Sequence, residues 1–240
     1  MTTERVNADF SQRVVLAIEA LPWIASPQRG VERRLLDRIG GEVARATSLV
    51  RYAPASAFSA HEHALGEEFL VLDGVFSDEH GDYPAGTYVR NPPGSRHSPR
   101  TGPGCTIFVK LRQMHLEETA RVVVDTTRRV WQPGAVAGHA QIALFASLDW
   151  EDVALERLDP GAELPRSENL GGEEILLIDG DLRDQIGTYE ARTWIRNPPG
   201  LRGALGSQRG AVYWVKRGHL RVPVRQTRHE TSIATAHRHR

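Results

Sequence analysis

Two histidines and a glutamate stand close together in the segment HEHALGEEFLVLDG, near the middle of the first half of the chain. In an extended strand, residues two apart point to the same face, so His61 and His63 project together. Glu67 follows after a turn and begins a run of apolar residues. His97 comes directly after the tight turn NPPG and is a fourth candidate. We expect these four side chains to converge.

Three imidazoles and one carboxylate suit Zn²⁺, or Fe²⁺, Mn²⁺ and Ni²⁺ with open coordination positions. A pair of histidines two residues apart is, by itself, more often a surface feature near a turn. Here the order H-x-H-x3-E is followed by a further histidine 34 residues after the second one, and that combination favours metal. We predict one divalent transition metal ion per chain, held by His61, His63, Glu67 and His97.

The chain repeats itself. The segment EEFLVLDG (67–74) is similar to EEILLIDG (173–180), and YVRNPPG (88–94) is similar to WIRNPPG (194–200). Both pairs are separated by 106 residues. An earlier segment, RVVLAIEALPW, is similar to RVVVDTTRRVW, which follows it at a separation of 108 residues. Such a long register indicates two copies of one structural unit.

We expect a first unit over residues 1–115, a second over 116–220 and a disordered tail over 221–240, where few large apolar groups could pack. Short segments rich in Val, Ile, Leu, Thr and Tyr alternate with glycine and proline clusters, which predicts an all-β sandwich or barrel. Without a Gly/Ser-rich linker between the copies, we expect them to pack closely. The leading strand of each copy could complete its own barrel or the other one.

The second copy serves as an internal comparison for the metal hypothesis. The separation of 106 residues places the following residues at the four ligand positions: Ser167, Asn169, Glu173 and Gly203. The Gly-Pro turns survive in the second copy while the three imidazoles are lost. Since the fold does not need the histidines, we expect metal in the first unit only.

The same segments resemble the cupin motifs. HEHALGEEFLVLDG resembles the first motif, G-x5-H-x-H-x3/4-E-x6-G, with Ala55 where the leading glycine is expected. GTYVRNPPGSRH resembles the second, G-x5-P-x-G-x2-H, and Thr101 replaces the asparagine that usually follows. The phrases FSDEHGDYPAGTYVRNPPGSRH and GCTIFVKL resemble more narrowly the ChrR-type cupins. That family includes the cupin half of zinc-dependent anti-sigma factors and bicupins related to acetylacetone-cleaving dioxygenases.

The resemblance covers nearly the whole chain. It implies an all-β protein of two tandem cupin barrels of the jelly-roll type, packed together. It also implies a metal in the mouth of the first barrel, held by His61, His63, Glu67 and His97. Since cupins often pair, the resemblance implies a homodimer as well.

Other polar residues are interpreted as structural. Glu68, Arg90 and Lys110 recur in the second copy as Glu174, Arg196 and Lys216, so we expect them to form salt bridges. Strand alternation directs Glu68 to the face opposite Glu67. Cys105 is expected to be an inert small residue. His80, His115 and His139 have no partners at ligand spacing and are expected at the surface.

The composition sets further limits. Lysine plus arginine and aspartate plus glutamate number 30 each, so the net charge of zero argues against nucleic acid or an anionic membrane as partner. No segment has the length of a membrane span or the form of a signal peptide. A single cysteine suits a reducing compartment, and we expect a cytoplasmic protein.

Three functions remain open. The leading hypothesis is a non-haem metal enzyme, resembling a dioxygenase, that acts on a small carbonyl compound; no separate acid–base pair is visible, so no catalytic residue is assigned. A second is a metal-dependent sensor or regulatory binding module. A third is a closed structural zinc site. Direct binding of a sigma factor is not expected, since the chain begins close to the first repeat and Cys105 is its single cysteine.

Overall fold

The computed structural model describes residues 4–147, 151–166 and 170–220, which form two barrels of β-strands. Within these residues the helical segments are two single turns of 3₁₀ helix, η1 (Ile18–Ala20) and η2 (Thr126–Arg128). Neither of these helices has the length and apolar character that crossing a membrane would require. The predicted tail over 221–240 lies outside the described residues. The predicted all-β class is confirmed.

The first barrel contains an eleven-stranded sheet and a separate two-stranded one. The larger sheet contains β1 (Arg5–Val6), β3 (Ile24–Ala25), β4 (Val31–Gly40), β5 (Ala44–Tyr52), β6 (Ser56–Ala57), β8 (Glu67–Asp78), β9 (Gly81–Pro84), β10 (Thr87–Asn91), β12 (Arg100–Thr101), β13 (Cys105–Leu111) and β14 (Val122–Asp125). Its main order is β1-β4-β5-β13-β8-β10-β14. The two-stranded sheet pairs β7 (His61–His63) with β11 (Ser95–His97).

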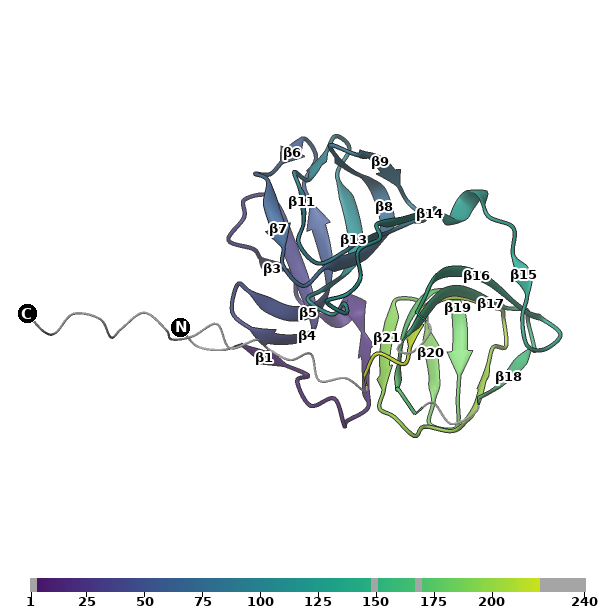
Figure 1. Ribbon diagram of the computed structural model, residues 1–240. Coiled ribbons are helices and arrows are strands. Elements are labelled where there is room, and N and C mark those ends of the chain that lie inside the picture. The colour runs from purple at the N-terminus through teal and green to yellow at the C-terminus, as the bar shows by residue number, and fades with distance from the viewer. Residues whose placement is uncertain (1–3, 148–150, 167–169, 221–240) are drawn as a thin grey trace, which may run out of the picture.

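The second barrel repeats this plan in a ten-stranded sheet. Its strands are β2 (Val14–Ala17), β15 (Gln132–Pro133), β16 (His139–Ala146), β17 (Asp152–Leu158), β18 (Glu163–Arg166), β19 (Glu173–Arg183), β20 (Thr188–Glu190), β21 (Thr193–Asn197), β22 (Gly203–Gly206) and β23 (Ala211–Arg217). The main order is β15-β16-β17-β23-β19-β21-β2. Figure 1 shows this barrel below the first one.

The two repeats exchange their leading strands. β2, from the first repeat, pairs antiparallel with β21 of the second barrel, with Val14 opposite Arg196. β14, from the second repeat, pairs with β10 of the first barrel, with Val122 opposite Arg90. The purple N-terminal stretch therefore lies beside green β21 in Figure 1. The sequence left this choice open, and the structure places each strand in the other copy's barrel.

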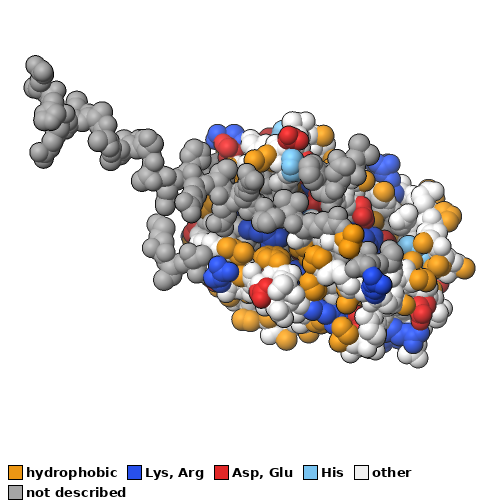
Figure 2. Space-filling view, turned by 60° about the horizontal axis from the view of Figure 1, so that its bottom comes forward, with side chains coloured by type: hydrophobic (Ala, Val, Ile, Leu, Met, Phe, Trp, Pro, Cys, Tyr) orange, Lys and Arg blue, Asp and Glu red, His pale blue; other side chains and the backbone are white. Residues whose placement is uncertain are grey.

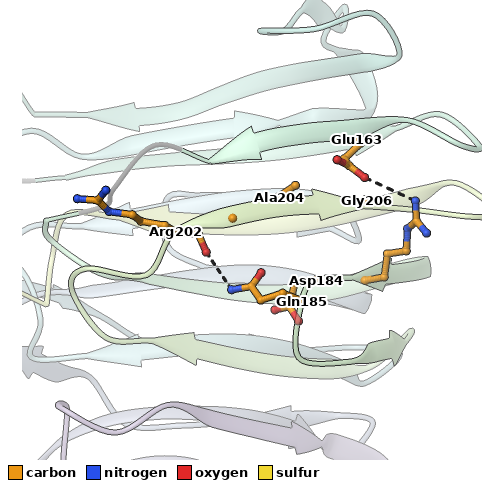
Figure 3. A pocket seen from close by; sticks show the side chains of 8 residues that line it. Glu163, Asp184, Gln185, Arg202, Ala204 and Gly206 are labelled. Atoms are coloured by element: carbon orange, nitrogen blue, oxygen red, sulfur yellow. Dashed lines mark hydrogen bonds and ion pairs between the residues drawn. The ribbon is translucent and has the colours of Figure 1, made fainter.

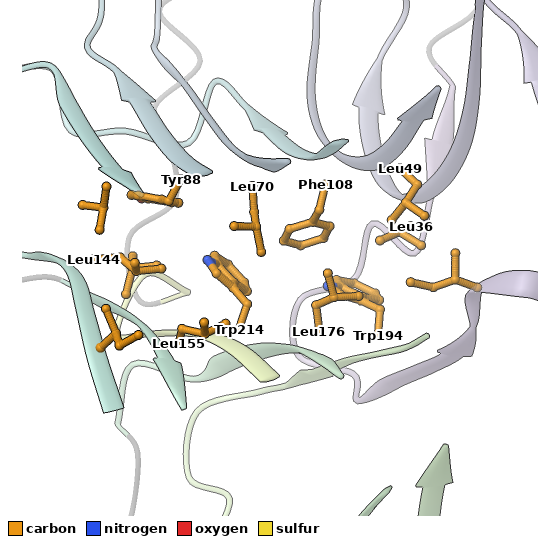
Figure 4. Packing of buried hydrophobic residues seen from close by; sticks show 14 residues of the cluster. Leu36, Leu49, Leu70, Tyr88, Phe108, Leu144, Leu155, Leu176, Trp194 and Trp214 are labelled. Atoms are coloured by element: carbon orange, nitrogen blue, oxygen red, sulfur yellow. The ribbon is translucent and has the colours of Figure 1, made fainter. Parts of the chain in front are cut away.

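Three hydrophobic clusters result, one inside each barrel and a third between them. Strand alternation on β8 turns Phe69 and Val71 into the first barrel, while Leu70 faces the second. Figure 4 shows the cluster between the barrels, where the rings of Phe108 and Trp214 meet edge to face at 5.0 Å. The predicted close packing of the two copies is confirmed.

Buried ion pairs cross the same interface in a reciprocal way. Lys110 Nζ of the first barrel lies 2.5 Å from Glu174 Oε2 of the second. Lys216 of the second barrel pairs in turn with Glu68 of the first, and Arg90 Nη1 lies 2.8 Å from Glu68 Oε2. The structural interpretation of these repeated charges is confirmed, and their partners lie in the opposite repeat as well as in their own.

The exposed charges are of both signs. On the face shown in Figure 2, the acidic and basic side chains of the described residues that are visible are interspersed with hydrophobic ones.

Candidate metal centre

Strand pairing brings the three histidines together. β7 and β11 run antiparallel, with His97 opposite His61 and Ser95 opposite His63. Side chains of paired residues lie on the same face of a sheet, so three imidazoles gather on one side of this small sheet. Glu67 is the first residue of β8, directly after the turn that ends β7.

The donor atoms of the four predicted ligands face one another. His63 Nε2 lies 2.9 Å from His97 Nε2, and each of these atoms lies 3.5 Å from Glu67 Oε2. The ligand atoms of His61, His63 and His97 all lie within 4.8 Å of one another. Donors around one first-row metal ion at bond lengths of about 2.0–2.2 Å are separated by roughly 3–3.5 Å. The donor set thus fits a divalent transition metal.

The cluster is buried at one end and open at the other. His97 is 3% exposed and Glu67 is 6% exposed, whereas His61 is an exposed residue. A ligand set that is buried throughout would shield an ion from solvent. Here the side of the cluster that carries His61 faces solvent.

Hydrogen bonds at the far ring nitrogens leave the near ones free for metal. His61 Nδ1 lies 3.1 Å from the carbonyl oxygen of Ser59, and His97 Nδ1 lies 3.4 Å from Asp78 Oδ2. A carbonyl or carboxylate oxygen accepts a hydrogen bond from the ring N–H at Nδ1, and in that tautomer of the neutral ring Nε2 carries the lone pair. Carboxylate–histidine–metal arrangements in known metal sites have the same order of groups.

Electrostatics keep the two carboxylates of the site ionised. Burial alone raises the pKa of Asp78, but hydrogen bonds from His97, the His80 backbone N–H and Tyr83 outweigh it and lower the pKa to about 2. Burial likewise raises the pKa of Glu67, and the nearby imidazoles with the Asn91 amide bring it below its ordinary value. Both groups are therefore anionic near neutral pH.

Three aromatic rings, Phe76, Tyr52 and Phe58, extend from the His97 side of this centre and form an aromatic wall. The ring of Phe76 lies 5.9 Å from that of His97, and Tyr52 contacts Phe76 and Phe58 edge to face at 5.8 Å and 5.3 Å. At a separation of 106 residues, the second barrel carries leucines at these three positions: Leu158, Leu164 and Leu182. At these three positions, aromatic rings therefore occur only in the repeat that carries the histidines.

In the second barrel, an arginine and an asparagine contact the equivalent glutamate. Glu173 Oε1 accepts hydrogen bonds from Arg166 Nη1 at 2.7 Å and from Asn197 Nδ2 at 2.8 Å. The counterparts of His61 and His63, Ser167 and Asn169, lie outside the described residues. Arg166 supplies the positive charge next to Glu173, so this carboxylate has a partner without metal.

The second barrel holds a pocket of about 480 Å³. Gly203, the counterpart of His97, lines it together with Arg183, Asp184 and Gln185. Figure 3 shows the Gln185 amide donating to the carbonyl oxygen of Arg202, at 2.9 Å. Among the described residues, no histidine or cysteine lines this pocket, so that part of the chain offers it no counterpart of the histidine cluster.

The structure places the remaining candidates as follows. Cys105 is buried, and burial raises the pKa of its thiol to about 11, in line with the expected inert residue. His80 is exposed as predicted, and His115 is half-buried. The surface prediction for His139 is wrong: its side chain is 5% exposed, and Nε2 lies 3.4 Å from Glu156 Oε2 inside the second barrel.

The centre contains two further polar residues, Asp78 and Asn91, whose role was not predicted from the sequence. Asn91 Nδ2 donates to Glu67 Oε2 at 3.1 Å, and Asp78 faces His97. Both recur in the second copy, as Asp184 and Asn197. Their recurrence was the available signal, but it equally fits a structural role.

Comparisons with known proteins agree with this architecture. The family model described as ChrR Cupin-like domain matches residues 11–115 and 119–221, one match for each repeat. The search of curated proteins found no match.

Several solved structures share the fold. A proposed dioxygenase from Nostoc punctiforme superposes with a TM-score of 0.73 at 15% identity, covering 89% of this chain and 86% of its own. A cupin 2 conserved barrel domain protein from Leptotrichia buccalis gives 0.59 at 12% identity, covering 85% and 96%. A deletion mutant of Bacillus subtilis oxalate decarboxylase gives 0.57 at 12% identity, covering 85% and 76%. At these identities the similarity shows the fold alone.

Proposed function

Because this chain belongs to the ChrR cupin-like family, we propose that its first barrel is the active site of a non-haem metal enzyme, resembling a dioxygenase, for a small carbonyl compound. The observation that carries the proposal is the pairing of two features in one barrel. The histidine cluster and the aromatic wall occur together in the first repeat, and both are missing from the second. A role in folding alone would not require them to occur together.

His61, His63, Glu67 and His97 would hold the metal ion in this proposal. When bound, an ion such as Fe²⁺ supplies a Lewis acid for the carbonyl oxygen and redox chemistry towards O₂. Asp78 holds the proton of His97 at Nδ1, which directs Nε2 towards the centre. Phe58, Phe76 and Tyr52 exclude water from one side of the site and offer an apolar surface to the substrate.

The exposure of His61 favours an enzyme over a closed structural zinc site. A structural zinc ion is surrounded by four protein ligands and needs no approach from solvent. In this cluster the side of His61 is open, while Glu67 and His97 are buried. A substrate can therefore reach the ion without opening the barrel.

Oxygen uptake by the full chain tests this proposal. Metal-free protein is loaded anaerobically with Fe²⁺ or with Zn²⁺ and mixed with a β-diketone such as 2,4-pentanedione, or with a simple ketone. The iron form is expected to consume oxygen with the β-diketone, and His63→Ala should abolish the reaction. His80→Ala is the control, since His80 is exposed and outside the cluster. If the iron form consumes no oxygen with any carbonyl compound, the sensor or structural zinc alternative is favoured.

A further inference from the structure

Arg121 reaches the first barrel from the second repeat. It stands directly before the exchanged strand β14, which pairs with β10. Its Nε donates to Asn91 Oδ1 at 2.9 Å, and its Nη2 donates to the hydroxyl of Tyr83 at 2.6 Å. Nη2 also lies 3.6 Å from Asp78 Oδ2. One guanidinium thus contacts three polar side chains behind the histidine cluster.

Two of these partners contact the predicted ligands directly. Asn91 Nδ2 donates to Glu67 Oε2 at 3.1 Å. Asp78 Oδ2 faces His97 Nδ1 at 3.4 Å, and Asp78 Oδ1 accepts from Tyr83 at 2.9 Å. Arg121 therefore lies one side chain away from two of the four ligands.

Because arginine can only donate hydrogen bonds, it determines which groups of its partners act as acceptors. A guanidinium can only donate hydrogen bonds, so the Asn91 amide must turn its oxygen towards Arg121 and its NH₂ group towards Glu67. The Tyr83 hydroxyl accepts from Arg121 and so directs its own proton to Asp78. The orientations of both partners follow from one side chain.

We propose that Arg121 is a positioning residue for the metal centre, which orients Glu67 through Asn91 and His97 through Asp78. The inference rests on the metal centre of the proposed function. Under this proposal, the metal site of the first barrel depends on a residue of the second repeat. The exchange of β14 places that residue in the first barrel.

The second barrel provides a matched control. Arg13, which precedes the other exchanged strand, donates to Asn197 Oδ1 at 2.7 Å and to the Tyr189 hydroxyl at 2.9 Å, and pairs with Asp184 at 2.7 Å. The contacts are the same, but Gly203 stands where the first barrel has His97. If these arginines only anchor the exchanged strands, replacing either should have the same effect.

The experiment compares Arg121→Met with Arg13→Met in the full chain. The dissociation constant for Co²⁺ and the visible spectrum of bound Co²⁺ are measured with metal-free protein, together with urea unfolding. Both variants should lose stability. We expect Arg121→Met to weaken Co²⁺ binding about 10–100-fold and to change the spectrum. Arg13→Met should leave the affinity and the spectrum at wild-type values.

Equal Co²⁺ affinity and spectra in the two variants would overturn the inference, while leaving the metal centre itself intact. If wild-type protein binds no Co²⁺, both the metal centre and this inference are wrong. Co²⁺ binding by the wild type therefore distinguishes failure of the inference alone from failure of the metal centre. Arg121→Lys covers the event that Arg121→Met does not fold. A lysine supplies a single point charge in place of the planar fork, so its Co²⁺ affinity should fall below that of Arg13→Lys.

Discussion

Ala55 adopts a left-handed backbone conformation, with φ of 55°. The first cupin motif expects glycine at this position, and the second repeat has Gly161 there with φ of 80°. The Cβ atom of alanine makes this conformation unfavourable, whereas glycine adopts it freely. Alanine therefore replaces the glycine of the motif, while the left-handed backbone conformation at this position is retained.

We predict that Ala55→Gly stabilises the protein by about 0.5–1 kcal/mol, since the strain removed exceeds the extra flexibility of the unfolded chain. Gly161→Ala should destabilise it by a similar amount, and nothing near Gly161 would obstruct the added Cβ. Urea unfolding of both variants measures these changes. A destabilised Ala55→Gly would show that the alanine side chain contributes more than its backbone conformation costs.

At the scale of residues, those parts of the candidate centre could be predicted whose sequence spacing is typical of metal ligands. His61, His63, Glu67 and His97 stand at ligand intervals, and the structure brings their donor atoms together. The role of Asp78 could not be assigned, because its recurrence as Asp184 fits a structural role equally well and nothing in its own segment shows that β8 ends beside His97. His139 looked isolated in sequence, and its partner Glu156 is visible only once β16 and β17 pair.

At the scale of elements, β8 serves two parts of the first barrel. Its first half pairs with β10 and β13, and its end pairs with β9 and β12. Gly74 lies where the strand bends, with φ of 72°. A Cβ added there would lie 2.0 Å from the carbonyl oxygen of Gly104 on the neighbouring segment. Only glycine allows this close approach.

Gly74→Ala is expected to destabilise the protein by at least about 2 kcal/mol, from backbone strain and the steric conflict with Gly104. Gly102→Ala is the control, because no atom lies within 4 Å of the added Cβ. Thermal or urea unfolding of the two variants tests the difference. Equal stabilities would mean that β8 can bend elsewhere.

The exchange of β2 and β14 was the part of the topology that sequence could not determine. Both leading segments are apolar and similar to each other, so either would fit the edge of either barrel. The choice depends on the path of the chain between the barrels and on the packing of their shared face. Repeat spacing and glycine–proline turns were sufficient for the all-β class, because they reflect local structure.

At the scale of the whole molecule, the two barrels share a hydrophobic cluster and reciprocal ion pairs. The side chains of Lys110 and Glu174 are 1% and 0% exposed. Burial alone raises the pKa of Glu174, but the ammonium of Lys110 and the imidazole of His219 hold it well below its ordinary value. Glu174 is therefore a buried anion between the barrels.

Lys110→Met should destabilise the protein by about 3–5 kcal/mol, because it leaves the Glu174 carboxylate without its main counter-charge. Glu163→Gln is the control, since it removes one partner of the exposed pair with Arg183 and should change stability by less than about 0.5 kcal/mol. Urea unfolding at neutral pH measures both. A small effect of Lys110→Met would mean that the other neighbours of Glu174, among them His219 and Arg45, can compensate its charge.

The metal content of the purified chain tests the central claim most directly. Protein prepared without affinity tag or chelator is analysed for transition metals beside His61→Ala/His63→Ala, with His80→Ala as the control. We predict about one equivalent of a divalent transition metal per chain in the wild type and in His80→Ala, and close to none in the double variant. A wild-type chain that contains no metal and takes up no added Fe²⁺, Zn²⁺, Mn²⁺ or Ni²⁺ would contradict the account, as would equal metal content in the double variant.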